Sequence, residues 1–464
     1  MDKYQKNSRK ATLTLDEKRV KPNKYPKQGI LSSIPFKDLE ILREESKLME
    51  IICDHENLNK AYKNVLKNKG SAGIDGMTVD QLFPYLKEHG QRVKAQLLDG
   101  TFKFQPVKQV EIPKTGGKGT RKLGIPTVLD RFVSQAILQI LQKYFDPKFS
   151  NHSYGFRPKK SPHQAISQAQ KYVAEGYKHV VDIDLESFFD KVNHDKLMSE
   201  IAKTVKDKRL LKLLRRLLTV GILSNGMVKA SDQGTPQGNP LSPLLSNIML
   251  DLLDKELERR GHKFCRFVDD CNVYVRSSRA GERVMRSLTN FIEKKLKLKV
   301  NQDKSAVDNV TKRSFLGFLF FNFKTPKIRL SPKAIKQFKD KIRELTRRGK
   351  WMRMKDVIAK IAQYCKGWLA YFGYSQTQNE LKALASWLRR KLRCAYWQQW
   401  KTTKNRFKQL RKLDVGSPLA RRTAGTSKGA WRISLSPALS YALPNSYFYE
   451  LGIPKFICRN TLTF

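Results

Sequence analysis

Acidic residues, paired cysteines and long apolar runs are all scarce in this 464-residue sequence. Its 42 Asp and Glu residues stand against 91 Lys and Arg residues, which leaves a formal net charge of +49. A charge so one-sided opposes compaction through self-repulsion, and a polyanionic partner explains it most simply. Nucleic acid is therefore the leading candidate for a partner.

The six cysteines show no CxxC spacing, so the sequence indicates neither a zinc site nor a disulfide framework, and a reducing cytoplasm fits. The N-terminus lacks the apolar core of a signal peptide, and no later run reaches the roughly 18 apolar residues that a membrane span needs. We therefore expect a soluble cytoplasmic protein with no membrane partner. A content of 40% hydrophobic and 10% aromatic residues predicts a folded chain of two or three domains.

The first half of the chain carries local signals for several elements. Residues 1–33 are polar and basic, and are interpreted as a mobile arm or an RNA-contacting extension. Thr78 with Gln81 resembles a capping box that starts a helix, and Thr127 with Asp130 predicts the start of an apolar helix that runs to about residue 144. Between them, residues 101–126 read as a β-type region rich in turns.

Further along, the pattern alternates between strands and helices. Residues 177–185 (YKHVVDIDL) predict a buried strand, 187–192 a turn, and 194–219 helices. We also expect a short strand at KLKV (297–300) and another at FLGFLFF (315–321).

The stretch KFCRFVDDCNVYVR (263–276) reads as a β-hairpin whose tip contains Asp269 and Asp270. Asn-Gly or Asp-Gly would make a better tight turn, because these residues accept positive φ at low cost. Two adjacent carboxylates could be no more than a solvated tip. If the hairpin pairs with the strand that bears Asp184, however, three carboxylates meet, and two Mg²⁺ ions would relieve their repulsion and stabilise the oxygens of a phosphoryl transfer.

Several blocks of the sequence closely resemble the reverse transcriptases encoded by bacterial group II introns. The resemblance covers nearly the whole chain, and its most specific blocks are GSAGIDGMTVDQL, RKLGIPTVLDRFVSQAI with SYGFRPKKSPHQAI, DIDLESFFDKVNHDKLM, QGTPQGNPLSP, FVDD, QDKS, SFLGFLF, YCKGWLAYFGY and SWLRRKLRCAYWQQWK. It implies an α+β right-hand polymerase of fingers, palm and thumb, with an antiparallel palm sheet and a helical maturase thumb.

The resemblance also implies a division of the chain. Residues 1–100 would form a basic N-terminal extension with a family-specific N-terminal block, and 101–325 the reverse transcriptase fingers and palm. Residues 326–420 would form the maturase thumb, and 421–464 a C-terminal tail that binds DNA. The chain stops at Phe464 without a Cys/His-rich nuclease domain, so it resembles the shorter enzymes of class C introns.

Residue roles follow from the same resemblance. Asp184, rather than Asp182, would be the first metal ligand, with the Leu185 carbonyl, Asp269 and Asp270, while Asp190 would be structural. Lys304 would be the general acid that protonates departing pyrophosphate. The remaining roles are a nucleotide pocket of Lys114, Arg121, Phe189 and Gln237, in which Phe189 collides with a ribose 2′-OH, and a primer grip of Leu316 and Gly317.

Residues 381–432 contain fifteen Lys or Arg and a single acid, Asp414, which predicts an RNA-binding surface. An apolar stripe at helical spacing leaves Arg389, Arg390, Arg393 and Lys401 on other faces. Trp397 also lies off that stripe, and we expect it to be the aromatic that contacts a nucleotide.

The predicted activity is RNA-directed DNA synthesis by two-Mg²⁺ nucleotidyl transfer, with intron-RNA binding that promotes splicing and target-primed retrotransposition. Its partners would be group II intron RNA, an RNA template with a DNA primer, target DNA and dNTPs. Two alternatives stay open: a host-adopted polymerase used in defence or DNA repair, and a maturase that acts mainly as an RNA-binding splicing cofactor. One departure from the family is that Phe267-Val268 replaces the usual Tyr-Ala before the two aspartates, which predicts a change in fidelity or rate.

Overall fold

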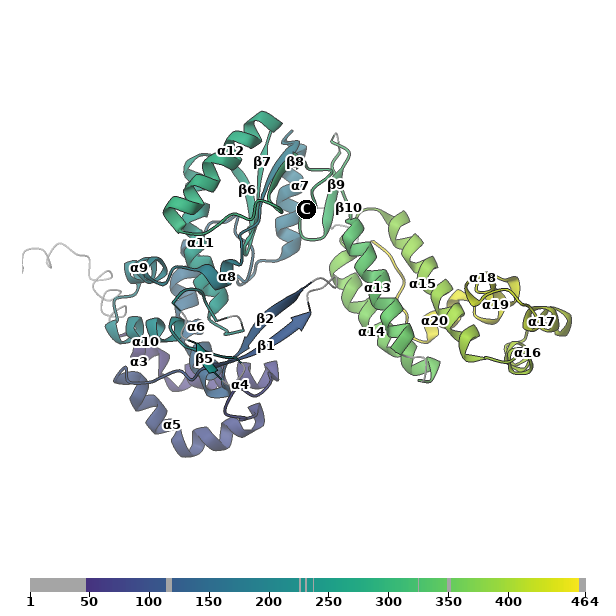
Figure 1. The fold of residues 1–464 in the computed structure, drawn as a ribbon, viewed down its shortest axis with the longest axis horizontal. Helices are drawn as coiled ribbons and strands as arrows, with labels where there is room; N and C mark the ends of the chain where they lie inside the picture. The colour runs from purple at the N-terminus through teal and green to yellow at the C-terminus, as the bar shows by residue number, and fades with distance from the viewer. Residues whose placement is uncertain are drawn as a thin grey trace, which may run out of the picture.

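The computed structural model combines helices and three small sheets in a chain of elongated shape (Figure 1). The residues that it describes are 47–113, 119–224, 227–229, 232–236, 238–323, 325–348 and 352–458. The arm predicted for residues 1–33 lies outside them. Within these ranges, no helix is both long enough and apolar enough to cross a membrane.

The N-terminal part of the described chain is helical. It contains α3 (Leu48–Ile52), α4 (His55–Asn68), the short 3₁₀ turn η2 (Val79–Gln81) and α5 (Leu82–Leu98). The predicted capping box is confirmed, since the Thr78 backbone N–H donates to Gln81 Oε1 over 2.8 Å.

A four-stranded sheet with the order β2-β1-β4-β5 follows. Its strands are β1 (Val107–Pro113), β2 (Thr120–Ile125), β4 (Ile222–Ser224) and β5 (Met227–Lys229). The expected β-type region is confirmed by β1 and β2, which pair antiparallel. The Thr127 side chain accepts from the Asp130 backbone N–H at the start of α6 (Val128–Phe145), so this predicted helix start is also confirmed.

The second four-stranded sheet, which we call the palm sheet, has the order β6-β7-β3-β8 with every pair antiparallel. Its strands are β3 (His179–Ile183), β6 (Lys263–Phe267), β7 (Asp270–Val275) and β8 (Ala306–Asn309). The strand and the hairpin predicted from the sequence are both present. At KLKV, only an isolated bridge between Val300 and Leu185 forms, so the strand predicted there was wrong.

Each face of the palm sheet packs into a different core. Val181 and Val273 face a core shared with α11 (Ser242–Arg259) and α12 (Ser278–Phe291). Val180 and Tyr274 face the opposite way, toward α7 (Pro162–Ala174) and toward the C-terminal helices. This alternation is the period-two pattern of a strand buried on both faces.

Shorter helices connect these parts. They are η3 (Asp146–Lys148), α8 (Phe188–Lys191), α9 (His194–Thr204), α10 (Lys208–Leu218) and η4 (Ile292–Leu296), a π-helical turn that continues α12. The helices expected within 194–219 are confirmed. The turn expected at 187–192 contains the single helical turn α8, which follows a left-handed Ser187.

The C-terminal part extends away from the palm sheet (Figure 1). It begins with the two-stranded sheet β9 (Phe318–Phe321) and β10 (Lys327–Leu330), followed by the long helices α13 (Pro332–Arg348), α14 (Met354–Phe372) and α15 (Gln378–Gln399). The short helices beyond them are α16 (Thr403–Lys412), α17 (Ser417–Ala424), α18 (Ala430–Ile433), α19 (Pro437–Ala442) and α20 (Asn445–Glu450). We call α13–α17 the thumb and α18–α20 the tail.

Candidate active site

The carboxylates singled out from the sequence meet at one edge of the palm sheet. β3 and β7 pair antiparallel with Ile183 opposite Cys271. The next residue beyond this pair on each strand is Asp184 on one side and Asp270 on the other, and Asp269 lies in the turn before β7. The register of the sheet therefore brings three carboxylates from two distant segments to the same edge.

The electrostatics of Asp270 reflect this gathering of negative charge. Desolvation of its carboxyl group raises the pKa most, and the charges of Asp269, Asp182 and Asp184 raise it further, to about 7. Lys304 acts in the opposite direction. A divalent cation would relieve this repulsion, so the chemistry of the side chains fits a metal-dependent site. Among the described residues, however, no three His, Cys, Asp or Glu side chains are already gathered in a metal-binding group.

Asp182 and Asp184 have different partners, although only one residue separates them. The Arg313 guanidinium donates twice to Asp182 Oδ2, from Nη2 over 2.8 Å and from Nε over 3.1 Å. Lys304 Nζ lies 3.2 Å from Asp184 Oδ1, at the edge where Asp270 also lies. The Asp184 backbone is held as well, because its N–H donates to Ser305 Oγ over 3.0 Å. Leu185, the predicted carbonyl ligand, is buried and forms the bridge to Val300.

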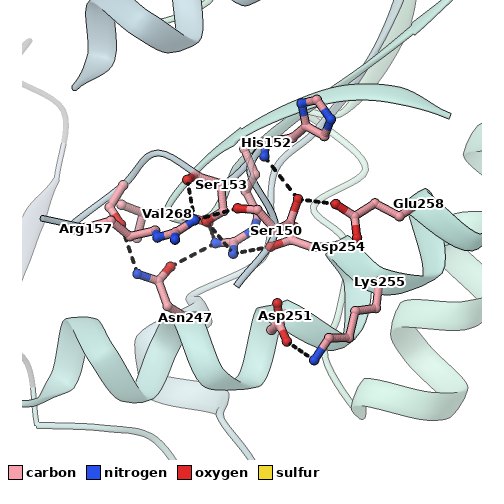
Figure 2. A network of polar contacts seen from close by, with 12 residues as sticks. Ser150, His152, Ser153, Arg157, Asn247, Asp251, Asp254, Lys255, Glu258 and Val268 are labelled. Atoms are coloured by element: carbon pink, nitrogen blue, oxygen red, sulfur yellow. Dashed lines mark hydrogen bonds and ion pairs between the residues drawn. The ribbon is translucent and has the colours of Figure 1, made fainter. Parts of the chain in front are cut away.

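Behind the hairpin lies a buried guanidinium, that of Arg266, which is 0% exposed. Its Nε and Nη2 bind both carboxylate oxygens of Asp254, which is also 0% exposed. Nη1 donates to Asn247 Oδ1 over 3.1 Å and to the Val268 carbonyl over 2.9 Å, and Nη2 also donates to Ser153 Oγ over 2.8 Å. Figure 2 shows these partners converging from α11, the loop at Ser150–Arg157 and the hairpin. The network ties the turn that carries Asp269 to the core.

The turn itself needs this support. Val268 has φ +62°, a left-handed conformation that a β-branched side chain rarely adopts. Gly155 packs directly against the backbone of this turn: a Cβ at Gly155 would lie 2.5 Å from the Val268 nitrogen, so only glycine fits there. The Gly155 carbonyl accepts from Asn247 Nδ2 over 2.9 Å, which links both sides of the turn to α11. The sequence interpretation missed Arg266, Asn247 and Gly155, although Arg266 directly precedes Phe267.

Part of the predicted nucleotide pocket falls outside the described residues. Lys114 and Gln237 both lie outside them, and for Arg121 only the backbone is described, in β2 opposite Ile112. Phe189 is half-buried against the ring of Phe188, with centroids 5.3 Å apart. Its carbonyl accepts from the Thr235 N–H over 2.6 Å, so the backbone at Phe189 is fixed to the segment that precedes Gln237.

The predicted primer grip forms a tight turn between the palm sheet and the thumb. Leu316 and Gly317 both have positive φ, +51° and +84°. Phe315 and Phe318 close the turn through two backbone hydrogen bonds of 2.9 and 3.0 Å, and the Gly317 carbonyl accepts from Ser331.

The basic residues proposed to bind RNA lie on and just beyond α15. Arg389, Arg390 and Arg393 are half-buried, and Lys401 is exposed. Arg390 and Arg393 have partners in the tail: Arg390 lies 3.9 Å from the Trp431 ring centroid, and Arg393 Nε donates to the Leu443 carbonyl over 3.0 Å.

The expectation for Trp397 was wrong. Its side chain is 1% exposed, and the guanidinium of Arg406 from α16 lies 4.5 Å from its ring centroid. Base stacking needs an exposed ring face, so Trp397 is a core residue between α15 and α16.

Two protein families match successive parts of the chain. Residues 112–320 match the family described as reverse transcriptase (RNA-dependent DNA polymerase), and residues 335–413 match the group II intron, maturase-specific domain.

Individual relatives cover different shares of the chain. Protein YkfC of Escherichia coli (strain K12) is 31% identical over 59% of this chain and 81% of its own length. The group II intron-encoded protein LtrA of Lactococcus lactis subsp. cremoris is 36% identical over 44% of this chain, and the match spans 34% of LtrA. A solved partial Cas6-RT-Cas1--Cas2 complex is similar with a TM-score of 0.36 and 24% identity, over 53% of this chain and 42% of that chain.

The reverse transcriptase match comes first and contains the palm sheet with its carboxylate edge. The maturase-specific match follows and lies in the helical thumb. The predicted α+β right-hand polymerase class is thereby confirmed. The chain belongs to the group II intron-encoded reverse transcriptases, in which a reverse transcriptase domain precedes a maturase-specific domain.

Proposed function

We propose that this protein is an RNA-directed DNA polymerase that extends a primer with dNTPs on an RNA template, and that its metal ion is Mg²⁺. The observation that carries this proposal is the strand register, with Ile183 opposite Cys271, which supports a shared site for Asp184, Asp269 and Asp270. The raised pKa of Asp270 supports the need for a cation at that edge.

Asp184, Asp269, Asp270 and the Leu185 carbonyl would hold the two Mg²⁺ ions, which stabilise the attacking and leaving oxygens when bound. Arg313 supports this assignment, because its guanidinium binds Asp182, whereas Asp184 is the residue that the strand register sets against Asp270.

Lys304 would donate a proton to the departing pyrophosphate, and its position 3.2 Å from Asp184 supports that role. Lys114 and Arg121 would bind the triphosphate by charge-assisted hydrogen bonds, and Gln237 would border the nucleotide. Phe189 would exclude a ribose 2′-OH by its bulk. Its carbonyl is fixed by Thr235 and its ring packs on Phe188, which supports a ring that does not move aside. Leu316 and Gly317 would support the primer end.

We further propose that the thumb and the tail bind group II intron RNA and target DNA, which would link DNA synthesis to splicing and retrotransposition. The excess of fifteen basic residues over one acid at 381–432 supports a surface that follows phosphates. Arg389 and Lys401 are candidates for such contacts, because both belong to this basic stretch and the Lys401 side chain is exposed. Cytoplasmic location is supported by the six cysteines, all of which are free thiols.

The decisive experiment is primer extension on RNA and DNA templates with deoxynucleotides or ribonucleotides, with and without Mg²⁺. We expect Mg²⁺-dependent extension with dNTPs on RNA, and we expect Asp269→Asn to abolish it while RNA binding persists, because an amide is a poorer metal ligand yet removes no basic contact. Full activity in the folded Asp269→Asn variant would contradict the metal assignment. A wild-type protein that binds intron RNA but extends no primer would favour the splicing-cofactor alternative.

A further inference from the structure

The last two residues of thumb helix α14 lie against the two residues of the predicted primer grip. Tyr371 Oη donates a hydrogen bond to the Leu316 carbonyl over 2.9 Å. The ring of Phe372 covers Gly317 so closely that a Cβ there would lie 2.9 Å from Phe372 Cε1. The thumb therefore contacts both left-handed residues of this turn.

Leu316 needs an external partner more than Gly317 does. Glycine adopts positive φ without cost, whereas leucine at φ +51° pays a steric penalty on the order of 1 kcal/mol or more. A hydrogen bond from a rigid helix end to the Leu316 carbonyl fixes the peptide plane and offsets part of that penalty.

Tyr371 is itself held from three directions. His163 Nε2 on α7 donates to the Tyr371 carbonyl over 2.8 Å. The Tyr371 ring packs on Phe318 of β9, with ring centroids 5.7 Å apart, and on Phe372, with ring centroids 4.8 Å apart. A donor locked in this way can set the position of the turn that it contacts.

The phenol also lies within electrostatic reach of the catalytic edge. Burial first, and then the negative charge of Asp270, raise the pKa of Tyr371 to about 12. At neutral pH, the hydroxyl is therefore protonated and available as a donor.

We propose that Tyr371 is a positioning residue through which the maturase thumb sets the primer-grip turn, and with it the position of the primer 3′ end. This inference rests on the proposed polymerase function. The inference goes beyond that function, because it requires a thumb residue outside the reverse transcriptase match at 112–320 for primer placement.

The test is steady-state primer extension by Tyr371→Phe, which removes one hydroxyl and keeps the ring. We expect the KM for primer–template to rise roughly twofold to tenfold, the range for loss of one hydrogen bond, while the KM for dNTP and the melting temperature change little. Tyr364→Phe is the matched control, because Tyr364 lies on the same helix and its ring stacks on Phe338, 5.9 Å between centroids, instead of on the turn.

A second variant separates positioning from packing. Asn accepts left-handed φ more readily than Leu, so Leu316→Asn should make the turn less dependent on its brace. Tyr371→Phe should then raise the primer KM less in the Leu316→Asn background than in the wild type. A primer KM unchanged by Tyr371→Phe, or an equal effect in both backgrounds, would overturn the inference while leaving the proposed function intact. Absence of extension by the wild-type protein would overturn both.

Discussion

Asp254→Asn tests the buried network that supports the hairpin of Asp269 and Asp270. Asp254 and Arg266 are both 0% exposed, and among the described residues Asp254 is the only carboxylate that forms an ion pair with this guanidinium. Burial alone would lower the pKa of Arg266, but the charge of Asp254 and its hydrogen bonds, with smaller contributions from Cys271 and Asp251, together raise it. Removing that charge leaves a buried cation uncompensated, so we expect a loss of about 3 to 5 kcal/mol in the free energy of unfolding.

The loss is large beside the typical stability of a domain, about 5 to 15 kcal/mol, and equilibrium unfolding in urea followed by circular dichroism would measure it. Asp340→Asn provides a matched control. It removes the same charge from an ion pair of 2.7 Å whose two side chains, Asp340 and Arg343, are each about half exposed. We expect this control to lose at most about 1 kcal/mol.

The network also predicts an effect on activity. Arg266 donates to the carbonyl of Val268, the residue with φ +62° that precedes Asp269. A rearranged guanidinium should release that turn, so folded Asp254→Asn protein should extend primers more slowly than the Asp340→Asn control. If the two variants lost equal stability and both kept full activity, our account of Arg266 as a brace would be refuted.

Three further predictions concern other parts of the molecule. Phe189→Ala should raise the ratio of ribonucleotide to deoxynucleotide specificity constants roughly tenfold or more, and an unchanged ratio would make Phe189 a core residue only. Burial raises the pKa of Asp130 to about 7, above its unfolded value of about 4, so the folded state binds more protons and stability should fall as the pH rises between these values. Urea midpoints at pH 5 and pH 8 should show this fall in the wild type, and the fall should be smaller in Asp130→Asn, in which only other raised carboxyl groups such as Asp270 still contribute. Replacing Arg389 and Lys401 together with Ala should lower the log-log salt slope of RNA binding by about 1.5, and a folded variant with the wild-type slope would contradict phosphate contacts there.

Local sequence signals predicted the elements that carry the carboxylates. The β-branched and aromatic residues in YKHVVDIDL and in KFCRFVDDCNVYVR are sufficient to indicate strands, and the side-chain caps at Thr78 and Thr127 depend only on residues three positions away. The hairpin and the Asp184 strand could therefore be predicted from the sequence, whereas their pairing entered the sequence analysis only as a condition.

The Arg266 network behind the hairpin could not be predicted from the sequence, because its partners are distant in the chain. Ser153 is 113 residues from Arg266, and no local pattern reports that Gly155 faces Val268. Trp397 was misplaced for a related reason. Helical periodicity assigns one buried face to α15, whereas α16 covers a second side of this helix and buries the ring against Arg406.

Mg²⁺-dependent primer extension on an RNA template by Asp184→Asn and Asp182→Asn tests the central claim most directly. Asp184 lies at the carboxylate edge beside Lys304, whereas Asp182 is bound by the Arg313 guanidinium. We predict that Asp184→Asn has no detectable extension, and that Asp182→Asn keeps Mg²⁺-dependent extension with some loss of stability. Full extension by the Asp184→Asn variant, or loss confined to Asp182→Asn, would contradict the catalytic centre described above.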